Sequence, residues 1–190
     1  MPTTGEILGG LDQEFAATYA KLMDKCVAAG FRIVPYDGAR SPWQQAIYWR
    51  QSRTKQQVQA KIAEVKNEGA PYIAKILDEV GPHSGKQVTD AIPGQSFHQF
   101  KRAVDSYVVS PDTHKALWRE QDKDGSEYQL AVELYDKMGD FAEALGLTWG
   151  GRWSFGDFGH VQGQKASSPM KEYGSWAKLD AALKAAWPAP

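Results

Sequence analysis

The stretch "GQSFHQFKRAVDSYVV", Gly94 to Val109, holds a histidine and an aspartate seven residues apart, at the border of a predicted strand. "AVDSYVV" alternates between apolar and polar residues, which is typical of a half-buried strand. Because seven is an odd number, an uninterrupted strand would place His98 and Asp105 on opposite faces of a sheet. The two side chains can therefore share a site only if "QFKR" forms a turn between them.

The sequence around this stretch predicts a few strands separated by helices. Strands are expected at "FRIVPY", "AVDSYVVS" and "GHVQ". Apolar residues at helical spacing, together with capping residues, predict the helices. These cover residues 11–29, 42–52, 55–81 with a break at "EGAP", 112–121, 126–145 and 170–187. The pattern favours an α+β fold in which a small antiparallel sheet is flanked by helices.

Length and composition predict one soluble domain over residues 1–190. The chain has 190 residues, a formal net charge of −1, 42% apolar residues and 24% charged residues. Because basic and acidic residues nearly balance, the sequence does not predict a basic surface for binding nucleic acid. No apolar run approaches the roughly 20 residues that span a bilayer, and the N-terminus lacks the pattern of a secretory signal. The one cysteine, Cys26, lies in a helical pattern and is expected to be a buried structural thiol.

Two of the four histidines stand out because each has a carboxylate close by in the sequence. His98 precedes Asp105, and His160 follows Asp157 by three residues. By contrast, His114 lies among charged residues on a predicted solvated helix face, and His83 lies in a glycine-rich loop. Two histidines and one carboxylate form a zinc set that leaves one position for water, and a second carboxylate can act as general base.

Other interpretations of these residues remain open on the sequence alone. On composition alone, two half-buried histidines with satisfied hydrogen-bond partners are favoured over a zinc site. Iron-dependent oxygenases also use two histidines and a carboxylate, but their carboxylate usually follows the first histidine by two residues. A purely structural zinc site would need no general base.

The motifs themselves resemble a known family. "SFHQFKRAVD" is similar to the S-x-H-x-x-G-x-A-x-D signature of the zinc peptidases that cut peptidoglycan stem peptides. "DFGH" resembles the second half of that signature. "YDGARSPWQQAIYW" resembles the family's G-x-R-S turn and the helix after it, and "GKQVTDAIPGQS" resembles the lead-in found in phage lysins. The blocks occur in the family's order over residues 31–162, and they imply the zinc D-Ala-D-Ala peptidase or hedgehog-like fold.

The resemblance implies a role for each matching residue. His98, Asp105 and His160 would bind one catalytic zinc ion. Asp157 would take a proton from the attacking water and pass it to the leaving amine. Arg40 would stabilise the oxyanion or hold a substrate carboxylate.

Three further residues are expected to support the site or to contact substrate. Ser96 would hold a ligand by a hydrogen bond, although a simple turn serine fits equally well. Gln45 lies in the helix after the G-x-R-S turn. Trp153 belongs to the cluster "TWGGRWSFGDF", which fits either a substrate groove or the core.

The sequence departs from the family pattern at two places. Lys101 stands where the family usually has glycine, inside the turn between the first two ligands. If that position needs a positive φ, lysine costs about 1 kcal/mol. Arg152 replaces an acidic residue often found after "GG", which predicts a cation near the mouth of the site.

The subclass follows from the general base. Phage-type endopeptidases commonly have aspartate at the position of Asp157, whereas the dipeptide-cleaving branch usually has glutamate. The resemblance therefore implies a monomeric endolysin that cuts between L-alanine and D-glutamate of peptidoglycan, without a separate wall-binding domain. It would be made in the cytoplasm and act on the wall after release, as a phage lysin or an exported toxin does. The alternatives are a D-alanyl-D-alanine carboxypeptidase or dipeptidase, and a non-catalytic zinc-bearing wall-binding module.

Overall fold

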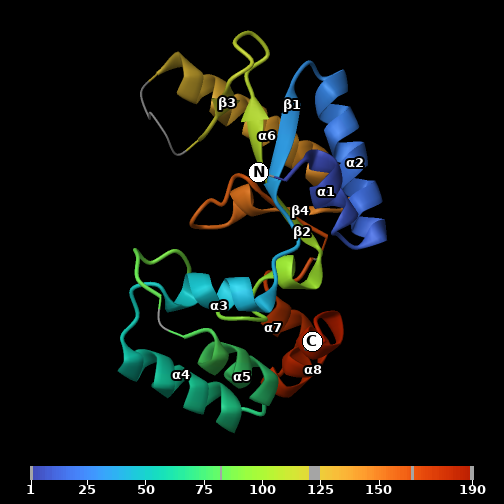
Figure 1. Cartoon of the computed structure of the whole chain (residues 1–190). Coiled ribbons are helices and arrows are strands. Elements are labelled where there is room, and N and C mark those ends of the chain that lie inside the picture. Colours follow the sequence, from blue (N-terminus) through green and yellow to red (C-terminus); the bar gives the residue numbers. More distant parts are fainter. Residues whose placement is uncertain (1, 82, 120–124, 164, 189–190) are drawn as a thin grey trace. The chain divides into compact units, whose positions relative to one another are not determined.

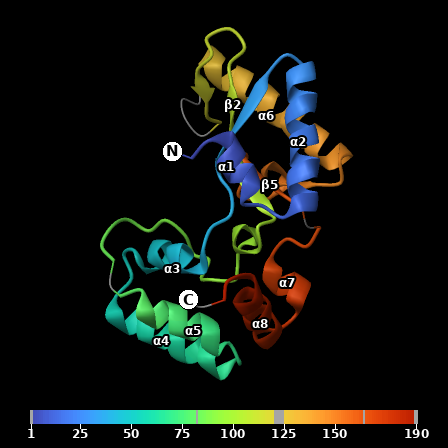
Figure 2. The same ribbon diagram turned by 45° about the vertical axis from the view of Figure 1, so that its right-hand side comes forward.

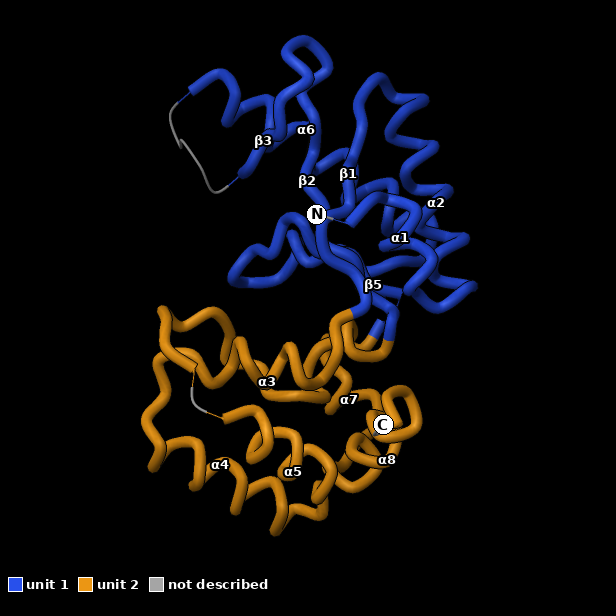
Figure 3. Tube along the Cα trace, viewed as in Figure 1, with its two compact units in different colours: residues 1–39, 101–165 blue, residues 40–100, 166–190 orange. Residues whose placement is uncertain are grey.

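The computed structural model describes residues 2–81, 83–119, 125–163 and 165–188. These residues form an α+β structure with a small antiparallel sheet and flanking helices, which confirms the expected fold class (Figures 1 and 2). The chain divides into two compact units, residues 1–39 with 101–165 and residues 40–100 with 166–190 (Figure 3). Each unit is described by itself, and a single catalytic domain over residues 1–190 stays a prediction.

The sheet belongs to the first unit and is antiparallel throughout. Its order is β1 (Arg32–Asp37), β2 (Ala103–Val109), β5 (His160–Gln162) and β4 (Thr148–Trp149), and β3 (Ala116–Leu117) pairs with β2. The β1–β2 register shifts between Pro35 and Asp37. Two residues of β1 there oppose one of β2, so Tyr36 is the extra residue of a β-bulge.

One face of the sheet carries the core of this unit. Helices α2 (Gln13–Ala28) and α6 (Ser126–Ala144) supply apolar side chains that pack against alternate residues of the strands. The short helix α1 (Thr4–Gly9) precedes α2, and Asp12 caps α2. Val104 and Val108 point into this core, and Cys26 is fully buried there, as expected for a structural thiol. Because strand residues alternate, Asp105 and Tyr107 lie on the opposite face.

The second unit is helical. It contains α3 (Pro42–Arg50), α4 (Lys55–Asn67), α5 (Pro71–Glu79), the short 3₁₀ helix η1 (Phe97–Phe100), α7 (Pro169–Tyr173) and α8 (Trp176–Ala186). Ser41 caps α3 and Pro42 occupies its first turn, as the sequence predicts. Residues 55–81 form two helices that part near "EGAP", also as predicted.

The prediction of a helix at residues 112–121 is wrong for the part that the structure describes. Ala116 and Leu117 form β3 instead, paired with Val109 and Val108 of β2. His114, expected on a helix face, is exposed in the hairpin turn at a φ of 57°. Pairing with a neighbouring strand outweighs the weak helix propensity of this segment.

Two other helix boundaries differ from the prediction. The expected helix at residues 170–187 is split into α7 and α8, because Gly174 adopts a left-handed conformation with a φ of 75° and ends α7. The helix expected from Leu11 starts at Gln13, since Asp12 is its N-cap. Within the described ranges, no helix is both long and apolar enough to cross a bilayer.

Candidate metal centre

Asp105 and His160 are brought together by strand pairing. They are direct partners in the β2–β5 register, on the face of the sheet opposite the core. Side chains at directly opposed positions of an antiparallel pair are neighbours. Accordingly, the His160 Nδ1 and Asp105 Oδ1 atoms are 3.0 Å apart. Register between two short strands therefore positions two of the three expected ligands.

His98 reaches the site from outside the sheet. It lies in η1, and Lys101 then reverses the chain with a φ of 61° before β2 begins. The turn that the odd spacing requires is thus present in the predicted segment. The Ser96 hydroxyl accepts a hydrogen bond from the backbone N–H of His98 at 3.4 Å. Ser96 therefore supports the backbone that carries His98, and no described contact joins it to the imidazole ring.

The three expected ligands form one group. A ligand atom from each of His98, Asp105 and His160 lies within 4.8 Å of the others. Both histidines are buried, at 3% and 6% exposure, and Asp105 is half-buried. Two imidazoles and a carboxylate are a donor set that suits zinc and leaves a position for water. The residues present therefore fit a catalytic zinc ion.

His160 is held in a strongly polar setting. Burial opposes its protonation, but the hydrogen bond and charge of Asp105 favour it, as do the charge of Asp157 and a hydrogen bond with Gln162. The net effect raises the pKa of His160. Its Nε2 atom lies 3.2 Å from the Gln162 Oε1 atom. The chain thus surrounds this imidazole with groups suited to a positive charge, which a metal cation also supplies.

Asp157 is joined to His160 by a tight turn. The Asp157 carbonyl accepts from the His160 N–H at 3.3 Å, and the Asp157 N–H donates to the Gly150 carbonyl at 3.0 Å. A Cβ atom on Gly150 would lie 2.6 Å from the Asp157 carbonyl oxygen and 3.1 Å from the His160 Cβ atom. Position 150 therefore accepts only glycine if this turn is to keep its shape. The first glycine of "GG" thus lets the backbone of the turn that joins Asp157 to His160 pass close to residue 150.

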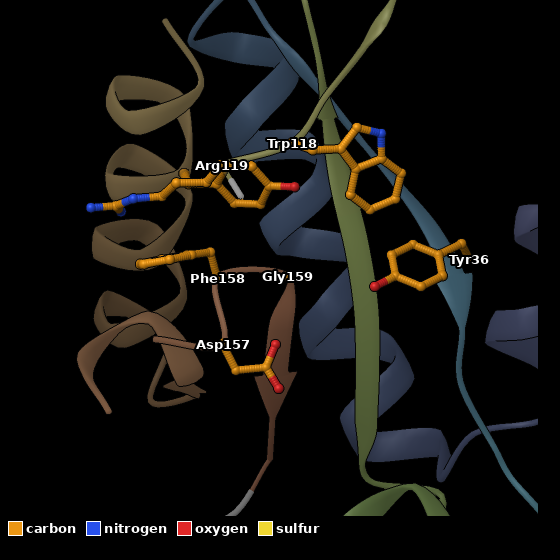
Figure 4. Close-up of a pocket in the computed structure, with 7 residues that line it drawn as sticks. Tyr36, Trp118, Arg119, Asp157, Phe158 and Gly159 are labelled. Atoms are coloured by element: carbon orange, nitrogen blue, oxygen red, sulfur yellow. The ribbon is translucent and has the colours of Figure 1, made fainter. Parts of the chain in front are cut away.

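The Asp157 side chain borders a cavity of about 100 Å³ in the first unit. Figure 4 shows the residues that line this cavity, with the Asp157 carboxylate directed into it. They are Tyr36, Trp118, Arg119, Tyr135, Asp157, Phe158 and Gly159. The predicted general base therefore faces open space in which a water molecule or a substrate group fits.

Arg40 and Gln45 support His98 within the second unit. The Arg40 backbone N–H donates to the His98 carbonyl at 3.1 Å, and its guanidinium donates to the Gln45 Oε1 atom at 3.0 Å. Gln45 is 1% exposed, and its amide also contacts Gln99 and the Ala91 carbonyl. Gln45 is thus occupied by protein partners and acts as a support for Arg40.

The aromatic segment after α6 divides between the core and the site. Trp149 is 1% exposed and belongs to the core. Trp153 is half-buried, and its ring centroid lies 5.1 Å from that of His160. Arg152 extends back to α6, where it pairs with Asp140 at 2.6 Å. Acidic residues of α6 pair with this guanidinium. The expectation of a cation near the mouth of the site stays a prediction.

Sequence reasoning missed Tyr36 and the cavity residues Trp118 and Arg119. Tyr36 immediately precedes the matched "DGARS" turn, so its place at the end of a strand was the available signal. Trp118 and Arg119 were hidden by the mistaken helix at residues 112–121. The remaining histidine, His83, lies 3.1 Å from the Val80 carbonyl through its Nε2 atom and is not part of the group.

Residues 89–163 match the family model described as D-alanyl-D-alanine carboxypeptidase. This segment, less than half of the chain, is similar to that peptidase family. The match contains all three expected metal ligands and Asp157. The expected class, a zinc-dependent peptidase related to the peptidoglycan D-Ala-D-Ala carboxypeptidases, is thereby confirmed, and zinc is its cofactor.

Curated proteins and solved structures provide two further comparisons. No curated protein matched the chain. Among solved structures, one match is a zinc complex of a variant of VanY, the vancomycin-resistance D,D-pentapeptidase from the VanB-type cassette. It is 18% identical with a TM-score of 0.44, and the match covers 91% of this chain and 83% of VanY.

Proposed function

We propose that the peptidase is an endolysin-type endopeptidase that cuts the bond between L-alanine and D-glutamate in peptidoglycan stem peptides. The observation that carries this proposal is the aspartate at position 157, three residues before His160. Phage-type members of the resembling family commonly have aspartate there, and members that release dipeptides usually have glutamate. The lead-in "GKQVTDAIPGQS" supports the same branch.

The proposed chemistry assigns the proton transfers to Asp157. Its carboxylate accepts a proton from the water that attacks the scissile carbonyl. The same carboxyl group then donates that proton to the leaving amine of D-glutamate, so Asp157 ends the cycle ionised. His98, Asp105 and His160 would hold the zinc ion, which when bound would supply a Lewis acid for the carbonyl and the water. Arg40 is assigned to a carboxylate of the stem peptide, for which its guanidinium is well suited.

We place the site of action at the cell wall, with the peptidase reaching its substrate after release from the cytoplasm. A wall-directed peptidase needs no stable membrane insertion and no nucleic-acid contact. The proposal includes a monomeric enzyme. Gel filtration with light scattering measures this directly, and a mass near 21.0 kDa is the expected result.

The decisive experiment is digestion of purified peptidoglycan by the zinc-loaded protein, followed by mass spectrometry of the fragments. The proposal predicts stem peptides with a new amino end at D-glutamate. Asp157→Asn keeps the shape of the side chain but removes the base. We expect kcat to fall by about 10²- to 10⁴-fold, the usual contribution of general acid–base catalysis.

The matched control is Asp112→Asn, which removes an exposed carboxylate in the β2–β3 hairpin. This variant should cleave at the wild-type rate. Both variants should retain zinc by elemental analysis, since neither removes an expected ligand. Undiminished cleavage by Asp157→Asn would rule out its role as base. Zinc binding without any cleavage would instead support a non-catalytic wall-binding module.

A second candidate function is favoured by the description of the matching family. A D-alanyl-D-alanine carboxypeptidase would use the same residues on the terminal bond of the stem. The same digestion separates the two functions. Loss of a single terminal D-alanine, with the L-alanyl-D-glutamate bond intact, would establish the carboxypeptidase and overturn the endopeptidase.

A further inference from the structure

Tyr36 projects from the same sheet face as Asp105, although it lies on a different strand. Residues of β1 alternate, so Ile33 points into the core and Val34 lies on the opposite face. The bulge at Tyr36 breaks the register at the point where β1 passes Asp105. Bulges of this kind redirect a side chain and often occur next to active sites. Tyr36 is thus on the face of Val34 and Asp105, and the bulge lies at this residue.

The Tyr36 hydroxyl lies among the groups of the proposed chemistry. A Cβ atom on Gly159, the residue before His160, would lie 3.6 Å from it. The side chain lines the same cavity as Asp157, and Figure 4 shows the hydroxyl and the Asp157 carboxylate pointing toward one another. The phenol oxygen thus faces the space that the general base also faces.

The phenol is available as a hydrogen-bond donor. Among the described residues, its hydroxyl has no hydrogen-bond partner. Burial raises the pKa of Tyr36, and the negative charges of Asp105 and Asp157 raise it further. The hydroxyl therefore keeps its proton at neutral pH. By contrast, Tyr135 in the same cavity donates to the Leu117 carbonyl at 3.3 Å.

Tyr36 is 40% exposed, and its ring packs against two aromatic neighbours. Its centroid lies 5.5 Å from that of Trp118 and 6.3 Å from that of Tyr107. Packing on two sides restricts the ring while one end of the phenol faces the cavity. A donor that is oriented before the reaction is the kind that stabilises charge developing in a transition state.

From this arrangement we infer that the Tyr36 hydroxyl donates a hydrogen bond to the oxygen of the scissile carbonyl as that oxygen gains negative charge. The proton stays on the phenol, and no bond of the tyrosine is made or broken. The inference depends on the proposed function only in that a peptide bond is hydrolysed on this face of the sheet. It assigns the oxyanion to Tyr36 and leaves Arg40 for a substrate carboxylate.

The test is Tyr36→Phe, which removes one oxygen atom and keeps the ring that packs against Trp118. The substrate is a muropeptide containing whichever stem bond the wild-type protein cuts, so an error in the proposed bond does not affect the result. We expect kcat to fall about 10²- to 10³-fold, as for loss of one oxyanion donor, with KM within about twofold of wild type. Zinc affinity, measured by competition with a chelator, should not change.

Tyr107→Phe is the matched control. Tyr107 lies on the same face and stacks with Tyr36, but it does not line the cavity. Its variant should keep wild-type kcat and KM. An equal loss in both variants would show that the effect comes from aromatic packing, and the inference would be wrong. A raised KM at unchanged kcat would also overturn it, because the hydroxyl would then bind the ground state.

Binding of a phosphinate dipeptide isostere separates this inference from the proposed function. Such a compound carries an anionic oxygen where the tetrahedral species would. Calorimetry should show that Tyr36→Phe weakens the phosphinate by the same factor as kcat/KM, while binding of the cleaved peptide stays unchanged. If the wild type hydrolyses no peptidoglycan bond, the proposed function fails. The phosphinate comparison then decides the role of Tyr36 by itself, and equal affinities would refute it.

Discussion

Lys101 occupies a backbone conformation that favours glycine. Its φ is 61°, and its carbonyl accepts a hydrogen bond from the Asp12 N–H at 2.9 Å. A side chain with a Cβ costs about 1 kcal/mol there. Lys101→Gly should therefore raise the free energy of unfolding by about 1 kcal/mol, measured by urea denaturation. Lys101→Ala keeps the Cβ and should give no such gain. Equal stability of the two variants would contradict the strain.

At the residue scale, much of the candidate site could be predicted from the sequence. The odd spacing of His98 and Asp105 required a turn, and the glycine position of the resembling signature located it at Lys101. The sequence does not predict the ion-pair partners of Arg152. They lie on α6 and become neighbours only when the chain has folded. Tyr36 was missed because the other residues of its cavity, Trp118 and Asp157 among them, are distant in sequence and become its neighbours only on folding.

At the scale of elements, α5 depends on a capping group from another helix. Its N-cap residue, Ala70, offers no side-chain acceptor. Instead the Asp180 carboxylate of α8 accepts from the backbone N–H groups of Tyr72 and Ile73 at 3.2 and 2.8 Å. Asp180→Ala leaves these buried donors unpaired and should cost about 2 kcal/mol of stability in thermal or urea unfolding. Lys178→Ala, at an exposed position of α8, is the control and should stay near wild type.

The elements that the sequence predicted correctly have strong local signals. Ser41 and Pro42 mark the start of α3, and alternation marks β2. The segment at 112–119 has no comparable signal. Its two strand residues are held by pairing with β2, and a two-residue strand is too short to show a period. Tertiary pairing thus decided what local propensity left open.

For the whole molecule, zinc should contribute to stability as well as to catalysis. The donor set of two buried histidines and an aspartate exists only in the folded chain. At free zinc about a thousand times the Kd, binding stabilises the native state by about 4 kcal/mol. Chelation should therefore lower Tm by on the order of 10 °C, and added zinc should restore it. Scanning calorimetry measures this shift without any activity assay.

His98→Ala and His114→Ala separate the site from general effects of zinc. The zinc-dependent part of Tm should disappear in the first variant, which lacks an expected ligand. It should persist in the second, because His114 is exposed in a hairpin turn. A zinc response that survives loss of His98 would place the metal elsewhere.

The division into two units was not visible in the sequence. Each unit combines two separate segments. "DGARSP" and "GQKASSP" lie near residues 39 and 165 and are rich in glycine, serine and proline, but "GPHSG" inside the second unit has the same composition and marks no changeover. Composition detects a unit boundary only where it coincides with a linker. The motif blocks, by contrast, supported the family resemblance, since they occur in the family's order within residues 31–162.

The lone thiol of the chain gives experimental access of a different kind. Cys26 is fully enclosed by the core, and burial raises its pKa to about 12. It therefore stays protonated and shielded at the pH of ordinary maleimide coupling. A cysteine introduced on the surface would be the single reactive thiol of the native protein. One fluorophore, or one point of attachment to a bead, can thus be placed at a chosen position without first removing the natural cysteine.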